Sequence, residues 1–101
     1  MAAVIINNNN YQQEVVNSEK KVLLDFWAPW CGPCQMVLPI VESIAAERHD
    51  IKVCKVNVDE NPELARQFRV MSIPTLVVME EGKILSQARG ARPKKAILGM
   101  L

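Results

Sequence analysis

Residues 21–34 read KVLLDFWAPWCGPC and place two cysteines directly after an apolar stretch. Its first part, Lys21 to Ala28, is a nearly continuous apolar run, which is typical of a strand buried on both faces of a parallel or mixed sheet. From Pro33 to Arg48 the apolar residues recur with the 3.6-residue period of a helix. The sequence therefore predicts a buried strand that leads through Cys31 and Cys34 into a helix.

Strand and helix patterns alternate along the rest of the chain. Strands are expected at residues 2–6, 51–58, 74–79 and 83–88, and helices at 11–18, 62–68 and after Arg92-Pro93. The alternation predicts an α/β fold with parallel crossovers in its first part, and Glu81-Gly82 predicts a tight turn between two antiparallel strands. We expect a single domain, residues 1–101, with a central mixed sheet of about five strands flanked by about four helices.

Composition limits the possible classes of protein. The chain has 101 residues, 12 lysines and arginines against 11 aspartates and glutamates, and 50% hydrophobic residues. A chain of this kind can bury a core without disulfides or metal ions, and its apolar fraction excludes intrinsic disorder. A net charge of +1 gives no reason to expect binding to nucleic acid or to a membrane. No apolar run approaches the ~20 residues of a membrane-spanning helix.

The N-terminal residues 1–10 lack the basic start and the long apolar region of a secretory signal. We therefore expect a cytoplasmic protein, in which thiols stay reduced and cysteines are more often catalytic or metal-binding than structural. The odd total of three cysteines also argues against a purely structural set of disulfides.

The Cys31–Cys34 pair carries the strongest chemical signal. Two cysteines three residues apart in the first turn of a helix project to the same side, close enough to form a disulfide. Cys31 would lie at the helix N-terminus, where free N–H groups and the helix dipole favour a thiolate, the nucleophile of disulfide exchange. Pro33 has no N–H and suits the first helical turn. The pattern favours a redox-active pair.

Two other interpretations of this pair remain open from the residues alone. A CxxC pair can be half of a zinc site, although the other candidate ligands here are only Cys54, His49 and distant carboxylates. A permanent structural disulfide is the second alternative, and a reducing compartment disfavours it.

Asp25 interrupts the apolar run before the two cysteines. A carboxylate at this position is expected to be buried and to have a raised pKa. The alternative is an edge-strand carboxylate that faces solvent.

Taken together, these motifs resemble the thioredoxin family over nearly the whole chain. The resemblance rests on residues 21–34, Pro39, 55–62, Ile73-Pro74-Thr75, Gly82 and Gly90. It implies the thioredoxin fold and a thiol–disulfide oxidoreductase that acts as a protein-disulfide reductase, with no bound cofactor and no metal. The implied partners are disulfide-containing substrate proteins and an NADPH-dependent flavoprotein, thioredoxin reductase, which reduces the protein again. A monomer is expected.

The resemblance also implies roles for individual residues. Cys31 is the attacking nucleophile, and Cys34 resolves the mixed disulfide to leave a Cys31–Cys34 disulfide. Asp25 exchanges a proton with Cys34, and Lys55 approaches Asp25 and tunes its charge, the alternative for Lys55 being a solvent-facing strand lysine. The residues expected to form the active-site loop and the substrate patch are Trp30, Gly32, Pro33, Ile73, Pro74, Gly90 and Ala91, with a cis peptide bond at Ile73-Pro74.

Some residues depart from the family pattern. Cys54 is an additional cysteine in an apolar strand, and we interpret it as an inert core residue rather than a regulatory thiol. Met71-Ser72 differs from the common family sequence and is expected to affect substrate preference. Residues 83–101 contain five basic residues and no acid. Arg89 and Arg92 are therefore candidates for steering acidic partners, although a solvated helix face explains them more simply.

Overall fold

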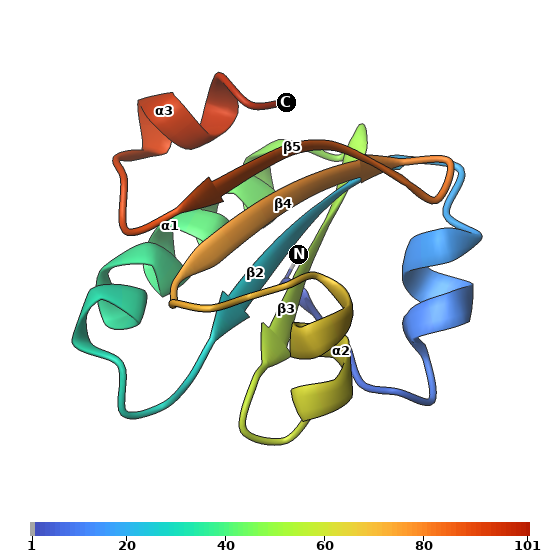
Figure 1. Ribbon diagram of the computed structural model, residues 1–101. Coiled ribbons are helices and arrows are strands. Elements are labelled where there is room, and N and C mark those ends of the chain that lie inside the picture. Colours follow the sequence, from blue (N-terminus) through green and yellow to red (C-terminus); the bar gives the residue numbers. More distant parts are fainter. Residues whose placement is uncertain (1) are drawn as a thin grey trace.

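The apolar strand before the two cysteines lies at the centre of the sheet, as its sequence predicts. A computed structural model describes residues 2–101, so that Met1, the first residue of the predicted domain, lies outside the described residues. In it, β2 (Lys21–Trp27) pairs with a strand on each side, and all its residues from Val22 to Phe26 are buried (Figure 1). Burial on both faces explains why this strand is apolar at successive positions rather than at alternate ones.

The five strands follow the order β1-β3-β2-β4-β5 and form one mixed sheet. Their bounds are Val4–Ile5 for β1, Ile51–Asn57 for β3, Thr75–Glu80 for β4 and Lys83–Arg89 for β5. β1 and β2 are parallel to β3, whereas β4 is antiparallel to β2 and β5 is antiparallel to β4. The helix before β4 therefore does not form a parallel crossover, although the alternation of strands and helices continues through it.

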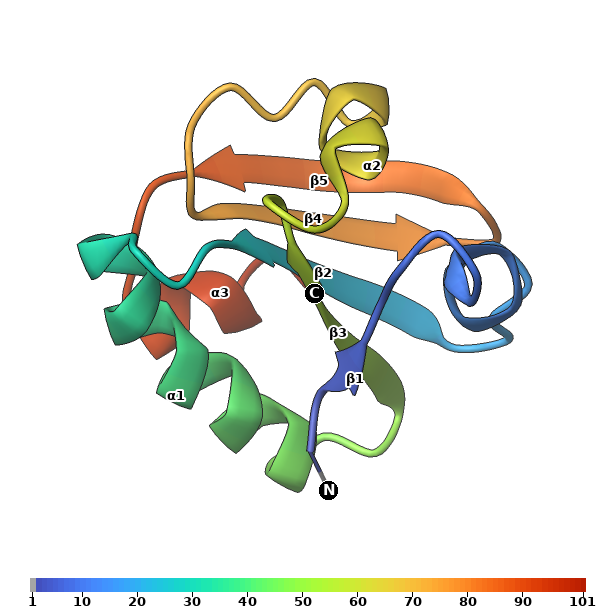
Figure 2. The same cartoon turned by 90° about the horizontal axis from the view of Figure 1, so that it is seen from below.

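The helices cover both faces of the sheet. α1 (Gly32–Glu47) and α3 (Lys94–Leu98) lie on one face, and α2 (Pro62–Gln67) lies on the other (Figure 2). The π-helical segment η1 (Gln12–Val16) contributes Val15 to the core on the α2 face. Within residues 2–101, these four helical segments and five strands agree with the predicted α/β architecture.

Side chains of the central strand alternate between two apolar cores. Leu23 packs under α1 and α3, whereas Val22, Leu24 and Phe26 pack under η1 and α2. Asp25 has the same parity as Leu23, since successive strand residues point to opposite faces. This places the Asp25 side chain on the face covered by α1, the helix that begins at the two cysteines.

The boundaries of the elements agree with the sequence patterns to within one or two residues, except at the end of the chain. The turn between β4 and β5 has positive φ angles at Glu81 (53°) and Gly82 (77°), as the tightest hairpin turns require. The last helix is short, because it begins after Pro93 and Gly99 follows its end at Leu98. No helix described within residues 2–101 combines the length and the hydropathy needed to cross a membrane.

Candidate functional site

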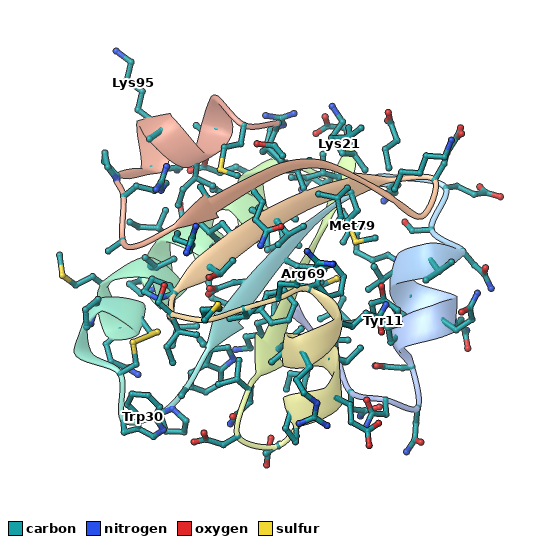
Figure 3. The ribbon with its side chains drawn as sticks, in the orientation of Figure 1. Tyr11, Lys21, Trp30, Arg69, Met79 and Lys95 are labelled. Carbon is teal, nitrogen blue, oxygen red and sulfur yellow. A yellow bond between two sulfur atoms is a disulfide. The ribbon has the colours of Figure 1, made fainter. Side chains whose placement is uncertain are left out.

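The two cysteines of the CGPC motif lie at the start of α1 and are joined by a disulfide, visible as a yellow bond in Figure 3. Their Cα atoms are 5.3 Å apart. Cys31 has the extended conformation of a helix N-cap, and its sulfur accepts a hydrogen bond of 3.2 Å from the backbone N–H of Cys34. A donor at this position stabilises negative charge on the Cys31 sulfur when the disulfide is open.

The two sulfurs differ in access to solvent. Cys34 is completely buried, whereas Cys31 is 5% exposed and borders a surface hollow of about 440 Å³. The hollow is mainly apolar, and the residues that line it are Trp30, Cys31, Gly32, Pro33, Val58, Ala65, Val70, Met71, Ser72 and Ile73. We call it the active-site hollow. A molecule that occupies it meets Cys31 before Cys34.

Trp30 forms one wall of the active-site hollow. Its side chain is 70% exposed and projects from the loop between β2 and α1 (Figure 3). The indole Nε1 donates a hydrogen bond of 2.8 Å to Oδ2 of Asp59, in the loop after β3. This bond fixes an exposed aromatic ring beside Cys31. In the sequence Asp59 stands only within a family motif, and its bond to Trp30 could not be predicted, because the bond joins two distant loops.

The segment between α2 and β4 forms the opposite wall. The Ile73-Pro74 peptide bond is cis, as the resemblance implied, and the carbonyl oxygen of Ile73 lies 3.7 Å from Cys31 Sγ. Pro74 is buried, and its carbonyl oxygen accepts a 2.8 Å hydrogen bond from the N–H of Gly90. The structure thus brings Ile73 to the cysteines and places Gly90 next to Pro74. Gly90 and Ala91 both lie outside the lining of the active-site hollow.

Asp25 is completely buried, which agrees with the expectation from the apolar run around it. Neither of its carboxylate oxygens has a hydrogen-bond partner among the described residues. Burial removes the carboxylate from water and raises the pKa of Asp25 to about 7, while the nearby Lys55 charge lowers it in part. The carboxyl group therefore changes its protonation state near neutral pH.

Lys55 lies beside Asp25 in the register of β2 and β3, on the face covered by α1. It is half-buried and does not point freely into solvent. Its Nζ lies 3.5 Å from Oε2 of Glu42, a residue of α1, and the other oxygen of Glu42 accepts a 2.6 Å hydrogen bond from the N–H of Ala3. Glu42 therefore holds the Lys55 ammonium group in an ion pair that does not include Asp25. Sequence reasoning missed Glu42, because its helical position shows no unusual pattern.

The third cysteine lies on the other face of the sheet. Cys54 is completely buried in the core under η1 and α2, and it forms no disulfide. Burial raises the pKa of the Cys54 thiol to about 12, so that it stays protonated at neutral pH. This environment agrees with the interpretation of Cys54 as an inert core residue.

The described part of the chain brings together no group of three histidine, cysteine, aspartate or glutamate side chains that could hold a metal ion. The structure joins the sulfurs of Cys31 and Cys34 to each other. The pair therefore has the arrangement of a dithiol that opens and closes, with an outer sulfur facing a hollow and an inner sulfur facing the core.

Comparisons with known proteins agree with this geometry. The family model described as Thioredoxin matches residues 2–101. A thioredoxin of Mycobacterium bovis is 52% identical over 84 residues, which cover 82% of this chain and 72% of that protein. A thioredoxin of Bacillus subtilis is 49% identical over 82 residues, covering 80% and 79%. A Mycobacterium leprae protein named bifunctional thioredoxin reductase/thioredoxin is 50% identical over 84 residues, covering 82% of this chain and 18% of that protein. The chain belongs to the thioredoxin family.

Proposed function

We propose that this protein reduces disulfides of other proteins through Cys31 and Cys34, with Cys31 as the attacking thiol. Thiol–disulfide oxidoreduction is the activity of the family to which the chain belongs. The observation that carries the proposal is the disulfide between an outer cysteine at the edge of an apolar hollow and an inner cysteine that is completely buried. Only the outer sulfur can meet a second protein first.

The reaction begins with the reduced pair. The Cys31 thiolate attacks one sulfur of the substrate disulfide, so that this bond breaks, a mixed disulfide forms and the other substrate sulfur leaves as a thiolate. Cys34 then loses its proton and attacks Cys31 Sγ. The second substrate sulfur leaves, and the Cys31–Cys34 disulfide remains. Two electrons pass from the cysteine pair to the substrate.

Asp25 is proposed to accept the proton that Cys34 loses. Three observations support this role: the carboxyl group is buried on the face covered by α1, no other described residue binds its oxygens, and its pKa is about 7. A base with a pKa near the working pH is ionised often enough to accept a proton and is still basic enough to take it. Lys55 is proposed to tune Asp25 by its positive charge.

The substrate is proposed to lie in the active-site hollow as an extended segment. The apolar side chains of Trp30, Pro33 and Ile73 offer contact area. The backbone of Ile73, beside Cys31, is proposed to form hydrogen bonds with an extended chain. Gly32 leaves space beside Cys31, since among residues 2–101 no atom outside its chain neighbours and the backbone of α1 lies within 4 Å of the position that a Cβ would take there. Gly90 and Ala91 are proposed to extend the same contact surface beyond Pro74.

The electron donor is proposed to be an NADPH-dependent flavoprotein reductase. The Mycobacterium leprae relative carries both a reductase and a thioredoxin in its name, which supports such a pairing. The flavin and the nicotinamide belong to that partner, and the cysteine pair needs no cofactor of its own for disulfide exchange. We further propose a monomer of one domain, residues 1–101, that works in the cytoplasm.

A trapping experiment tests the proposed order of attack. In a Cys34→Ser, Cys54→Ala variant, Cys31 is the only cysteine. A mixed disulfide between Cys31 and an insulin chain should therefore accumulate when the variant is mixed with insulin, and dithiothreitol should release the chain. The matched control is Cys31→Ser, Cys54→Ala, which keeps only the buried Cys34. Mass spectrometry is expected to find insulin chains on the first variant alone. Equal trapping by the control would reject Cys31 as the attacking residue.

A further inference from the structure

A second hollow adjoins the active-site hollow at Met71. It measures about 550 Å³ and lies between the end of α2 and β5, where it is lined by Gln67, Phe68, Arg69, Met71, Ile84, Gln87 and Arg89. We call it the arginine hollow. Met71 belongs to the lining of both hollows, and its side chain is 85% exposed. An extended chain can therefore pass from Cys31 over Met71 into the arginine hollow.

Among the described residues that line this hollow, Arg69 and Arg89 are the charged ones. Figure 3 shows Arg69 between α2 and the strands β4 and β5. Neither arginine forms an ion pair with a carboxylate of residues 2–101, where the four ion pairs use Arg48, Lys52, Lys55 and Lys94. The hollow thus has two positive charges without a negative partner from the described chain.

Arg92, the second arginine predicted to steer acidic partners, has a different role from Arg89. Its guanidinium group donates hydrogen bonds to the carbonyl oxygens of Arg89 and Gly90, at 2.7 and 3.4 Å. Arg92 therefore holds the loop after β5, and it does not line the arginine hollow.

The backbone conformation of Arg69 is unusual for a residue with a side chain. Arg69 follows α2 with φ of 55°, and the N–H groups of Arg69 and Val70 bond to carbonyl oxygens of the last helical turn. This left-handed position favours glycine, since a Cβ is strained there. An arginine occupies it even though glycine fits the backbone better.

We infer that the arginine hollow binds an acidic side chain of the substrate, so that this protein prefers disulfides with an aspartate or glutamate a few residues away on one side of the cysteine. The inference rests on the proposed function of Cys31. Two guanidinium groups give a carboxylate charge-assisted hydrogen bonds. The amide groups of Gln67 and Gln87 donate to the Tyr11 hydroxyl and to the Phe68 carbonyl oxygen, so the two arginines supply the positive charge of the hollow. The apolar floor of Phe68 and Ile84 suits the carbon atoms of the same side chain.

Disulfide peptides of matched sequence test this inference. Each peptide has one cysteine activated as its thiopyridyl disulfide, with glutamate, glutamine or lysine at successive positions on either side. Release of thiopyridone by the reduced protein gives a second-order rate constant, which is divided by the rate of the same peptide with dithiothreitol. At about 10 mM salt we expect glutamate to react about fivefold faster than glutamine, with lysine slowest, at positions on one side only. The ratio of the glutamate rate to the glutamine rate should fall towards one at about 1 M salt.

Variants test whether the arginine hollow, rather than the overall charge of the protein, causes the glutamate preference. Arg69→Gly and Arg89→Gln should each reduce the glutamate preference, and the double variant should remove it. Lys95→Gln is the matched control, because Lys95 lies on α3, far from Arg69 in Figure 3, and should keep the preference. Arg69→Gly is expected to unfold at the same or a higher temperature than the original protein, since it relieves the left-handed backbone. A lost preference then does not reflect a damaged fold.

Three results would overturn the inference: equal normalised rates for glutamate and glutamine peptides, a preference that survives in the double variant, or an equal loss in Lys95→Gln. Failure of the proposed function looks different, because the protein would then release thiopyridone from every peptide no faster than a simple thiol such as dithiothreitol does.

Discussion

Cys31 and Cys54 have nearly the same exposure but very different surroundings. Cys31 is 5% exposed and Cys54 is completely buried, so burial alone does not separate them. Cys31 begins a helix, receives an N–H hydrogen bond and borders an open hollow. Cys54 lies in the middle of β3, and its neighbours are apolar side chains of the core. Reactivity therefore follows from nearby donors and from access for a second sulfur.

Cys34 is as buried as Cys54, yet only Cys34 forms a disulfide. The difference lies in which face of the sheet each thiol meets. Cys54 and Lys55 are consecutive in β3, so their side chains point to opposite faces. Lys55 and Asp25 lie on the face covered by α1, the helix that carries Cys34 in its first turn, and Cys54 faces the other way. A buried thiol can react when a buried carboxylate and an attackable disulfide share its face.

The largest effect is expected from removing each of the two thiols in turn. Cys31→Ser should reduce the rate of insulin reduction with dithiothreitol to that of dithiothreitol alone, because the attacking sulfur is gone. Cys54→Ala should keep the original rate and cost about 1–2 kcal/mol of unfolding free energy, since it leaves a small cavity. Turbidity of the precipitating insulin chains and urea denaturation measure the two effects. A catalytic loss in Cys54→Ala would break the distinction between the sites.

Removing the carboxylate should stabilise the protein most at high pH. The pKa of Asp25 is about 7 in the folded protein against an ordinary value of 3.8. Below about pH 4 both states are protonated, and ionisation favours the unfolded state as pH rises towards 7. The stability of Asp25→Asn relative to the original protein should therefore increase by about 4 kcal/mol between about pH 3 and about pH 8.

Urea denaturation of the oxidised protein at several pH values measures this difference. A constant difference between the two proteins would show that Asp25 titrates normally and is accessible to water.

The same substitution should slow the step that involves Cys34. Asp25→Asn is expected to lower the rate of mixed-disulfide resolution by about tenfold or more above neutral pH, where the original carboxylate is ionised and can accept the proton. Below about pH 6 the two rates should approach each other, because Asp25 is then protonated. Stopped-flow fluorescence of Trp27 and Trp30 during the oxidation of reduced protein follows the step. Parallel pH profiles for the two proteins would exclude Asp25 as the base.

A smaller effect is expected from the ion pair beside Asp25. Glu42→Gln removes the negative charge that holds Lys55, whose Nζ lies 3.5 Å from the Glu42 carboxylate. The positive charge of Lys55 then acts more strongly on Asp25. The pKa of Asp25 should fall, and the midpoint of the pH–rate profile should move down by about half a unit. Glu47→Gln on the same helix is the control, because Glu47 pairs with Lys94 instead. A midpoint that moves up would mean that Glu42 supports the Lys55–Asp25 interaction.

The sequence predicts the parts of the site that depend on local pattern. The central strand, the start of α1 and the burial of Asp25 all follow from the apolar run and the CGPC motif, because each involves residues close together in the chain. The cis bond at Ile73-Pro74 followed from the family resemblance, since a sequence gives only a weak preference for this form.

Long-range pairings could not be predicted in this way. The bonds between Trp30 and Asp59 and between Lys55 and Glu42, and the shared hollow of Arg69 and Arg89, all join residues that the fold brings together. The direction of β4 belongs to the same class, because alternation of strands and helices favours parallel pairing and β4 pairs antiparallel with β2. Polar residues on exposed loops also carry no periodic signal that would mark their partners.

Competitive alkylation tests the difference between the cysteines most directly. The reduced protein is treated with limiting iodoacetamide at neutral pH, and fragment masses assign the modified residue as a function of time. We predict that Cys31 is modified first, that Cys34 follows far more slowly, and that Cys54 reacts only after urea unfolds the protein. Modification of Cys34 or Cys54 in the folded protein at the rate of Cys31 would contradict the account.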